Sequence, residues 1–102
     1  MVSNKTFRQL ALSLDGVYEK PHFERMAFRT TKRIFATLQE EQSTVNVKLS
    51  PEDQSVFCLF DSSTIYAVPN KWGQQGWTTI NLKLVKKSML MDALRTAFAA
   101  AR

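Results

Sequence analysis

The sequence predicts a single α+β domain in which helices flank an antiparallel β-sheet. Three observations support this class. Apolar residues recur at helical spacing near both ends of the chain and once in the middle, apolar and polar residues alternate in the segments between, and the turns joining the alternating segments are short. Short connections favour antiparallel pairing, because parallel neighbours need a long crossover. The predicted order of elements is α-β-β-β-α-β-β-α.

The first third of the chain is predicted to form a helix followed by a hairpin. Apolar residues at the spacing of one helix face cover residues 4–14, and Ser3 or Asn4 can cap the start of this helix. Alternation then predicts strands over residues 25–30 and 33–39, joined by a tight connection.

The middle of the chain is predicted to form a half-buried strand and a second helix. Valine and leucine alternate with polar residues over 44–49, which is typical of a strand with one buried face. The helix is expected over residues 51–60, because Ser50 is a good capping residue and Pro51 suits the first helical position.

Two more strands and a final helix are predicted in the last third. The strands cover residues 65–68 and 77–82, and the helix covers residues 88–101 with Ser88 as its cap.

The segment between the last two strands holds both tryptophans and two of the three glycines. We expect the glycines and Trp77 to shape the entry into the following strand. Trp72 is as consistent with a buried position as with an exposed one.

Composition indicates one small domain. The chain has 102 residues, of which 44% are hydrophobic, so we expect one modest core and a single domain over residues 1–102. One cysteine excludes an internal disulfide, and no apolar run reaches the length of a signal peptide or a membrane span. We therefore expect a cytoplasmic protein without membrane attachment, and a monomer by default.

No set of residues suggests a catalytic site, a metal site or a cofactor. His22 is the single histidine, and it stands apart from any group of His, Cys or Asp at metal-ligand spacing. Cys58 lies in an apolar run without a basic neighbour that would activate its thiol. We therefore expect a protein without enzymatic activity and without a bound cofactor.

Basic residues gather in two blocks that contain no acidic residue. The net charge is +5, and the blocks cover residues 25–33 and 62–91. If the blocks meet in space they form a basic face, which attracts nucleic acid or another acidic partner. An ordinary solubility charge explains the same composition equally well.

Several segments resemble the MmcQ/YjbR-like family, and together they cover nearly the whole chain in one order. The matching segments are Leu14-Asp15-Gly16-Val17, His22-Phe23-Glu24-Arg25, Phe28-Arg29, Ile34-Phe35-Ala36-Thr37-Leu38, Val47-Lys48-Leu49-Ser50-Pro51-Glu52 and Trp72-Gly73-Gln74-Gln75-Gly76-Trp77-Thr78-Thr79-Ile80-Asn81-Leu82. The resemblance implies a CyaY-like α+β fold, in agreement with the predicted order of elements. Members are often labelled DNA-binding by structural analogy to winged modules. This chain departs from the family at residues 22–24, where many relatives carry a Pro-Phe-Gly-like turn.

The leading functional hypothesis is non-catalytic binding of double-stranded DNA, mainly through its phosphates. Arg25 and Arg29 are expected on one side of a strand, and the basic tip that follows is suited to track a phosphate backbone. The proposed contact residues are Arg25, Arg29, Lys32, Arg33, Lys71, Trp72 and Lys83. The alternative is an interaction module in which a cleft beside the Trp72–Trp77 loop binds a small molecule or an acidic protein.

Overall fold

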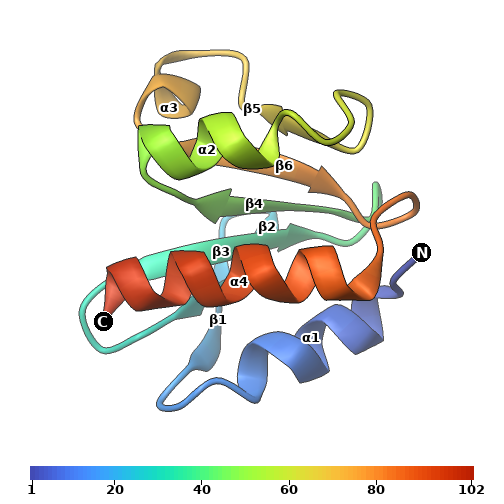
Figure 1. The fold of residues 1–102 in the computed structure, drawn as a ribbon. Helices are drawn as coiled ribbons and strands as arrows, with labels where there is room; N and C mark the ends of the chain where they lie inside the picture. Colours follow the sequence, from blue (N-terminus) through green and yellow to red (C-terminus); the bar gives the residue numbers. More distant parts are fainter.

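A six-stranded antiparallel sheet is the centre of the fold (Figure 1). In the computed structural model, which describes residues 1–102, the strands lie in the order β1-β2-β3-β4-β6-β5. The strands are β1 (Tyr18–His22), β2 (Arg25–Arg29), β3 (Ile34–Gln39), β4 (Thr44–Lys48), β5 (Ile65–Ala67) and β6 (Trp77–Asn81). The helices are α1 (Asn4–Leu12), α2 (Pro51–Phe57), α3 (Lys71–Gln74) and α4 (Lys87–Ala101). The α+β class with helices flanking an antiparallel sheet is confirmed.

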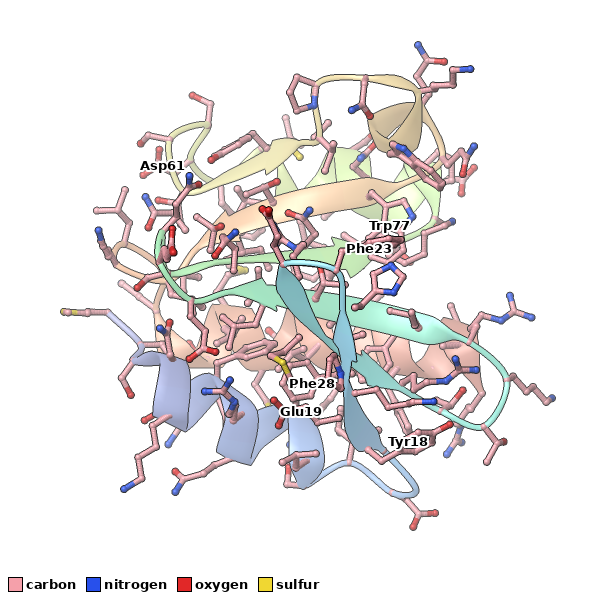
Figure 2. The ribbon with its side chains drawn as sticks, turned by 180° about the vertical axis from the view of Figure 1, so that it is seen from behind. Tyr18, Glu19, Phe23, Phe28, Asp61 and Trp77 are labelled. Atoms are coloured by element: carbon pink, nitrogen blue, oxygen red, sulfur yellow. The ribbon has the colours of Figure 1, made fainter.

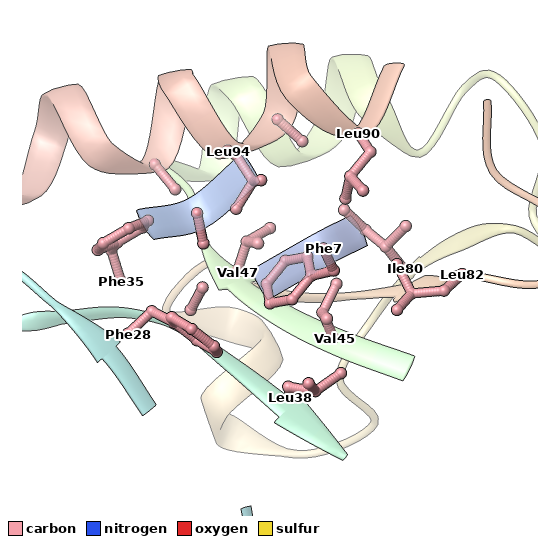
Figure 3. Close-up of a cluster of buried hydrophobic side chains, with 14 of the residues drawn as sticks. Phe7, Phe28, Phe35, Leu38, Val45, Val47, Ile80, Leu82, Leu90 and Leu94 are labelled. Atoms are coloured by element: carbon pink, nitrogen blue, oxygen red, sulfur yellow. The ribbon is translucent and has the colours of Figure 1, made fainter. Parts of the chain in front are cut away.

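The core lies between one face of the sheet and the helices α1, α2 and α4 (Figures 1 and 3). Phe7 of α1 meets Phe28 edge to face with ring centroids 5.2 Å apart, and Phe35 of β3 meets Phe98 of α4 at 5.8 Å. Aromatic pairs of this geometry add to the stabilisation that area burial gives. The helices therefore bury one face of the sheet and leave the other free of helical cover.

The open face of the sheet is polar and aromatic (Figure 2). Side chains alternate between the faces of a strand, so the pairing register shows which residues share a face. One row of paired residues crosses four strands on the open face: Thr37, Asn46, Thr79 and Tyr66. The Thr79 hydroxyl donates to Asn46 Oδ1 at 2.7 Å, which ties two of these strands together.

Two elements are present that the predicted order lacks. The first is β1, which pairs with β2 and is an edge strand of the sheet. Pro21 in this strand favoured the prediction of a loop. An edge strand tolerates proline, however, because one side of its backbone needs no hydrogen-bond partner. The second is α3, a single turn in the segment that was expected to be a loop. The observed order is therefore α-β-β-β-β-α-β-α-β-α.

The helix starts are capped as expected in two of three cases. Ser3 Oγ accepts from the amide of Thr6 at 3.0 Å, and Ser50 Oγ accepts from the amide of Asp53 at 3.1 Å. The prediction of Ser88 as the cap of the last helix is wrong, because α4 starts one residue earlier, with Lys86 as its cap and no side-chain hydrogen bond. None of the helices has the length and hydrophobicity that crossing a membrane requires.

Candidate binding cleft on the open face of the sheet

A cleft of about 260 Å³ opens on the helix-free face of the sheet, where β2, β3 and β4 meet the segment around α3. Strands supply its floor and the loop between β5 and β6 supplies one wall. The lining residues are His22, Arg25, Thr37, Asn46, Val68, Trp72 and Trp77. The cleft therefore combines one guanidinium, two indoles, one imidazole and neutral hydrogen-bonding groups.

Arg25 is the charged group of the cleft. Its Nε donates to Thr37 Oγ1 at 2.9 Å, and no carboxylate pairs with it, because both ion pairs of the structure use Arg8. Burial lowers the pKa of the Arg25 guanidinium from its usual value, although arginine stays charged at neutral pH. A partly desolvated cation without an acidic partner favours an incoming anionic group.

Trp72 projects from the one-turn helix α3, and 58% of its surface is exposed. Asn70 caps the start of this helix, and its Oδ1 accepts from the amide of Trp72 at 2.9 Å. The structure therefore answers the open question about Trp72 in favour of exposure. Trp77 is half-buried and lines the same cleft from the start of β6, so it is both a packing residue and part of the surface.

The two glycines of this segment are required by close backbone approach. A Cβ at Gly73 would lie 1.8 Å from the Val68 carbonyl oxygen, and a Cβ at Gly76 would lie 1.7 Å from that of Leu49. Gly76 also has φ +107°, a conformation that side chains disfavour. The glycines therefore have the structural task that the sequence suggested: they let the loop pack against the neighbouring strand ends.

Gln54 and Lys48 hold the same loop from the side. Gln54 Nε2 lies 3.0 Å from the Gly73 carbonyl oxygen and 3.2 Å from that of Trp77, so α2 is tied to α3 in the middle of the loop and to the start of β6. Lys48 Nζ donates to the Gln75 carbonyl oxygen at 2.6 Å. These bonds satisfy carbonyls of the loop and preorganise the wall that carries Trp72.

Phe23 stands at the tip of the β1–β2 hairpin beside the cleft. It is 95% exposed and has φ +58°, which is unfavourable for a bulky side chain. Its neighbours His22 and Arg25 pair across the two-residue turn and both line the cleft. A strained and fully exposed aromatic at this place is a candidate functional residue, because strain tends to persist where function needs it.

Trp77 also lines a second hollow of about 300 Å³, together with Arg33, Lys48 and alanines from the end of α4. Arg25 lines the first hollow and Arg33 lines the second, so both basic residues share Trp77 as a lining residue. Lys48 joins them, although sequence reasoning did not select it. A chain of anionic groups that passes Trp77 would meet positive charge in both hollows.

The remaining predicted contact residues are spread more widely. Arg29 shares the face of Arg25 further along β2, with its guanidinium 6.0 Å from the centre of the Tyr18 ring. Lys32 lies exposed in the β2–β3 turn, and Lys71 lies exposed on α3. Lys83 follows the far end of β6, and since β6 has five residues this end is about 13 Å from Trp77. The structure thus brings Arg25 and Trp72 together in the cleft, places Arg33 in the second hollow that shares Trp77, and leaves Lys83 outside both.

Sequence reasoning missed His22, Phe23 and Lys48 as members of this surface. His22 and Phe23 were missed because strand β1 was missed. His22 shares the open face with Tyr18 and Lys20 only when β1 pairs with β2, and Phe23 lies in the turn that joins these two strands. Nothing in the sequence signalled Lys48, because its place in the same hollow as Arg33 depends on where β3 begins and β4 ends in space.

The structure also shows the surroundings of the side chains that could bind a metal ion or act as a nucleophile. No three His, Cys, Asp or Glu side chains come together where they could hold a metal ion. Burial raises the pKa of the Cys58 thiol, which keeps it protonated near neutral pH and weakens it as a nucleophile.

The fold and the cleft define a class: a small α+β protein whose antiparallel sheet is covered by helices on one face and open on the other. The model of the YjbR family matches residues 12–100, so the chain belongs to the YjbR family. The family resemblance inferred from the sequence is confirmed.

Two solved structures share this fold. The crystal structure of a Deinococcus radiodurans protein with a DUF419 domain is 21% identical, with a TM-score of 0.80 over 95% of this chain and 76% of that one. A structural-genomics protein from Pseudomonas syringae is 13% identical, with a TM-score of 0.76 over 99% of this chain and 100% of that one. At these identities the likeness concerns the fold alone. No curated protein sequence matches this chain.

Proposed function

We propose that this protein binds nucleic acid without catalysing a reaction, and that the open face of the sheet is the binding surface. The observation that carries the proposal is the unpaired Arg25 in a cleft walled by Trp72 and Trp77. Arginine contacts phosphate, and exposed indoles stack on bases. Arg33 and Lys48 extend the positive charge past Trp77.

Single-stranded segments fit this surface better than a duplex. Stacking on Trp72 needs a base that is free of its partner, and stacking contributes about 1–3 kcal/mol for each base. The duplex mode predicted from the sequence used Lys83, which lies at the far end of β6 from the cleft. We therefore place the main contacts at Arg25, Arg33 and Trp72.

The volume of the cleft limits what it can hold. About 260 Å³ is below the roughly 300–1,000 Å³ of typical pockets for drug-sized ligands. One base with its phosphate suits such a cleft better than a large ligand does. A small planar anion that enters the same cleft is the second candidate, because Arg25 and the indoles suit it for the same reasons.

Fluorescence anisotropy distinguishes these functions. The probes are a labelled single-stranded oligonucleotide of about 12 nucleotides and the matching duplex, titrated at low and moderate salt. We expect saturable binding that is tighter for the single strand, weakens with salt and is reduced about tenfold by Trp72→Ala. Absence of saturable binding to either oligonucleotide contradicts the proposal. Thermal stabilisation by a small anion such as a mononucleotide, without oligonucleotide binding, favours the second candidate.

A further inference from the structure

An apolar groove of about 340 Å³ lies at the other end of β6, between the end of α2 and the start of α4. Aromatic, aliphatic and methionine side chains form most of its wall. The lining residues are Phe60, Asp61, Thr64, Ile65, Leu84, Val85, Lys86 and Met89. None of them belongs to the cleft on the open face of the sheet, so this is a separate surface.

The rim of the groove exposes large apolar side chains to solvent. Phe60 is 62% exposed and Leu84 is 53% exposed. Val56 in the last turn of α2 and Leu59 just after this helix are exposed as well. Apolar side chains gathered in this way around a groove are typical of an interaction site, whereas single exposed ones are ordinary.

The charge around the groove is positive and unpaired. Lys86 lines the groove, Lys83 and Lys87 stand beside it in the turn and at the start of α4, and none of the three is in an ion pair. The single carboxylate of the groove is Asp61. It accepts from the hydroxyl and amide of Ser63 at 2.7 and 3.0 Å, and these bonds lower its pKa, so its charge is already solvated by its own turn.

The lysines at the start of α4 also interact unfavourably with the dipole of this helix. The amino-terminal end of a helix carries partial positive charge and favours acidic side chains. α4 has no acid in its first turn and no side-chain cap. Carboxylates of a partner that approach Lys86 and Lys87 would relieve this repulsion.

We propose that this groove docks an acidic, amphipathic segment of another protein. Its apolar side chains lie between Phe60 and Leu84, and its carboxylates face Lys83, Lys86 and Lys87. A second copy of this chain fits less well, because a symmetric contact would place the same lysines against each other. An anionic membrane fits less well too, because the groove is concave and includes Asp61.

Selection from a displayed library of random peptides of about 16 residues, followed by synthesis of the enriched sequences, tests the proposal. We expect the enriched peptides to combine Leu or aromatic residues with a net negative charge. Binding should weaken about tenfold with Leu84→Glu, and Lys86→Glu should also reduce it. Both side chains are exposed, so the variants should fold, which circular dichroism and thermal melting verify. Trp72→Ala is the matched control and should leave peptide affinity unchanged.

Each of four results would overturn the proposal. The first is a selection that yields no binding peptide, and the second is enriched peptides without net negative charge. The third is a dimer in sedimentation that Leu84→Glu dissociates, which assigns the groove to a second copy. The fourth is binding to phosphatidylglycerol vesicles that Leu84→Glu abolishes, which assigns it to a membrane.

Discussion

Arg25 gains its importance from what surrounds it rather than from its charge alone. The chain has 14 lysines and arginines, yet among those proposed for binding only Arg25 lies in the cleft with both indoles. Its Nε is held by Thr37 and its pKa is lowered by burial, so the guanidinium is fixed and partly stripped of water. Such a group binds an anion with less loss of side-chain entropy than a mobile surface lysine does.

Gly76 sets how closely the loop approaches β4, and its replacement tests this. We expect Gly76→Ala to lower the free energy of unfolding by at least about 3 kcal/mol, because a Cβ would meet the Leu49 carbonyl oxygen in a left-handed backbone. The control is Gly16→Ala, with φ +74° and no atom near its Cβ, which should cost about 1 kcal/mol. Urea unfolding followed by tryptophan fluorescence measures both. Equal losses for the two variants would show that the close approach has no energetic consequence.

Substitution of Phe23 is expected to affect stability and oligonucleotide binding in different ways. Phe23→Gly should leave the protein as stable or more stable by up to about 1 kcal/mol, because glycine adopts the observed positive φ without strain. The same change should weaken oligonucleotide binding, since it removes an exposed ring beside the cleft. Phe23→Tyr keeps the ring and should keep the affinity. If Phe23→Gly leaves the affinity for the oligonucleotide unchanged, the strained backbone at Phe23 does not serve oligonucleotide binding.

At the scale of elements, an arginine network joins the first helix to the sheet. Arg8 of α1 contacts Glu19 of β1 at 3.1 Å and Glu40, just after β3, at 2.8 Å. The hydrogen bonds from Arg8 lower the pKa of Glu40. The folded state therefore gains stability from the ionised Glu40, and this gain is complete above the ordinary pKa of 4.5 and is lost as the pH falls below it.

Glu40→Gln tests this network through its pH dependence. We expect the variant to unfold at lower urea concentration than the natural sequence at pH 7, and the difference to shrink as the pH falls below about 4.5. The effect should be modest, because Glu40 is exposed and surface ion pairs contribute little. Glu41→Gln is the control, since Glu41 has no ion pair. If the difference in urea unfolding between Glu40→Gln and the natural sequence is constant with pH, the ion pair between Arg8 and Glu40 does not contribute to stability.

The element scale is also where sequence reasoning had mixed success. The amphipathic helices and the strands over the middle of the chain were predicted, because their periodicity is set by core burial, as at Phe28, Val45 and Val47. The edge strand β1 was missed, because four of its five residues are exposed and leave no alternation of burial to detect. The turn α3 was missed because one helical turn has no period.

At the scale of the whole molecule, the protein presents two surfaces at opposite ends of β6. The aromatic and arginine cleft lies beside the start of the strand, and the apolar groove with its lysines lies beyond the end. Each surface contains a basic side chain that is in no ion pair, Arg25 in the cleft and Lys86 in the groove. Two separated positive regions suit two different partners better than one continuous polyanion.

Salt dependence tests this division. Each phosphate contact that is lost should reduce the slope of log affinity against log salt by about one. We therefore expect Arg33→Ala to lower the slope for single-stranded oligonucleotide, and Lys83→Ala to leave it unchanged. The measurement is a series of anisotropy titrations at several salt concentrations. If Lys83→Ala lowers the slope as much as Arg33→Ala does, the nucleic acid extends along the whole of β6 and the two surfaces are not separate.

The sequence by itself determined the fold class, the family and the structural role of the glycines. Those properties follow from local pattern, because burial periodicity and close backbone approach leave their record in residue types. Only the tertiary structure decided which basic residues meet. It placed Arg25 and Arg33 in two hollows that share Trp77 and left Lys83 beyond the far end of β6. The reason is that side chains from different strands become neighbours through sheet register and twist, which the linear spacing of charges does not encode.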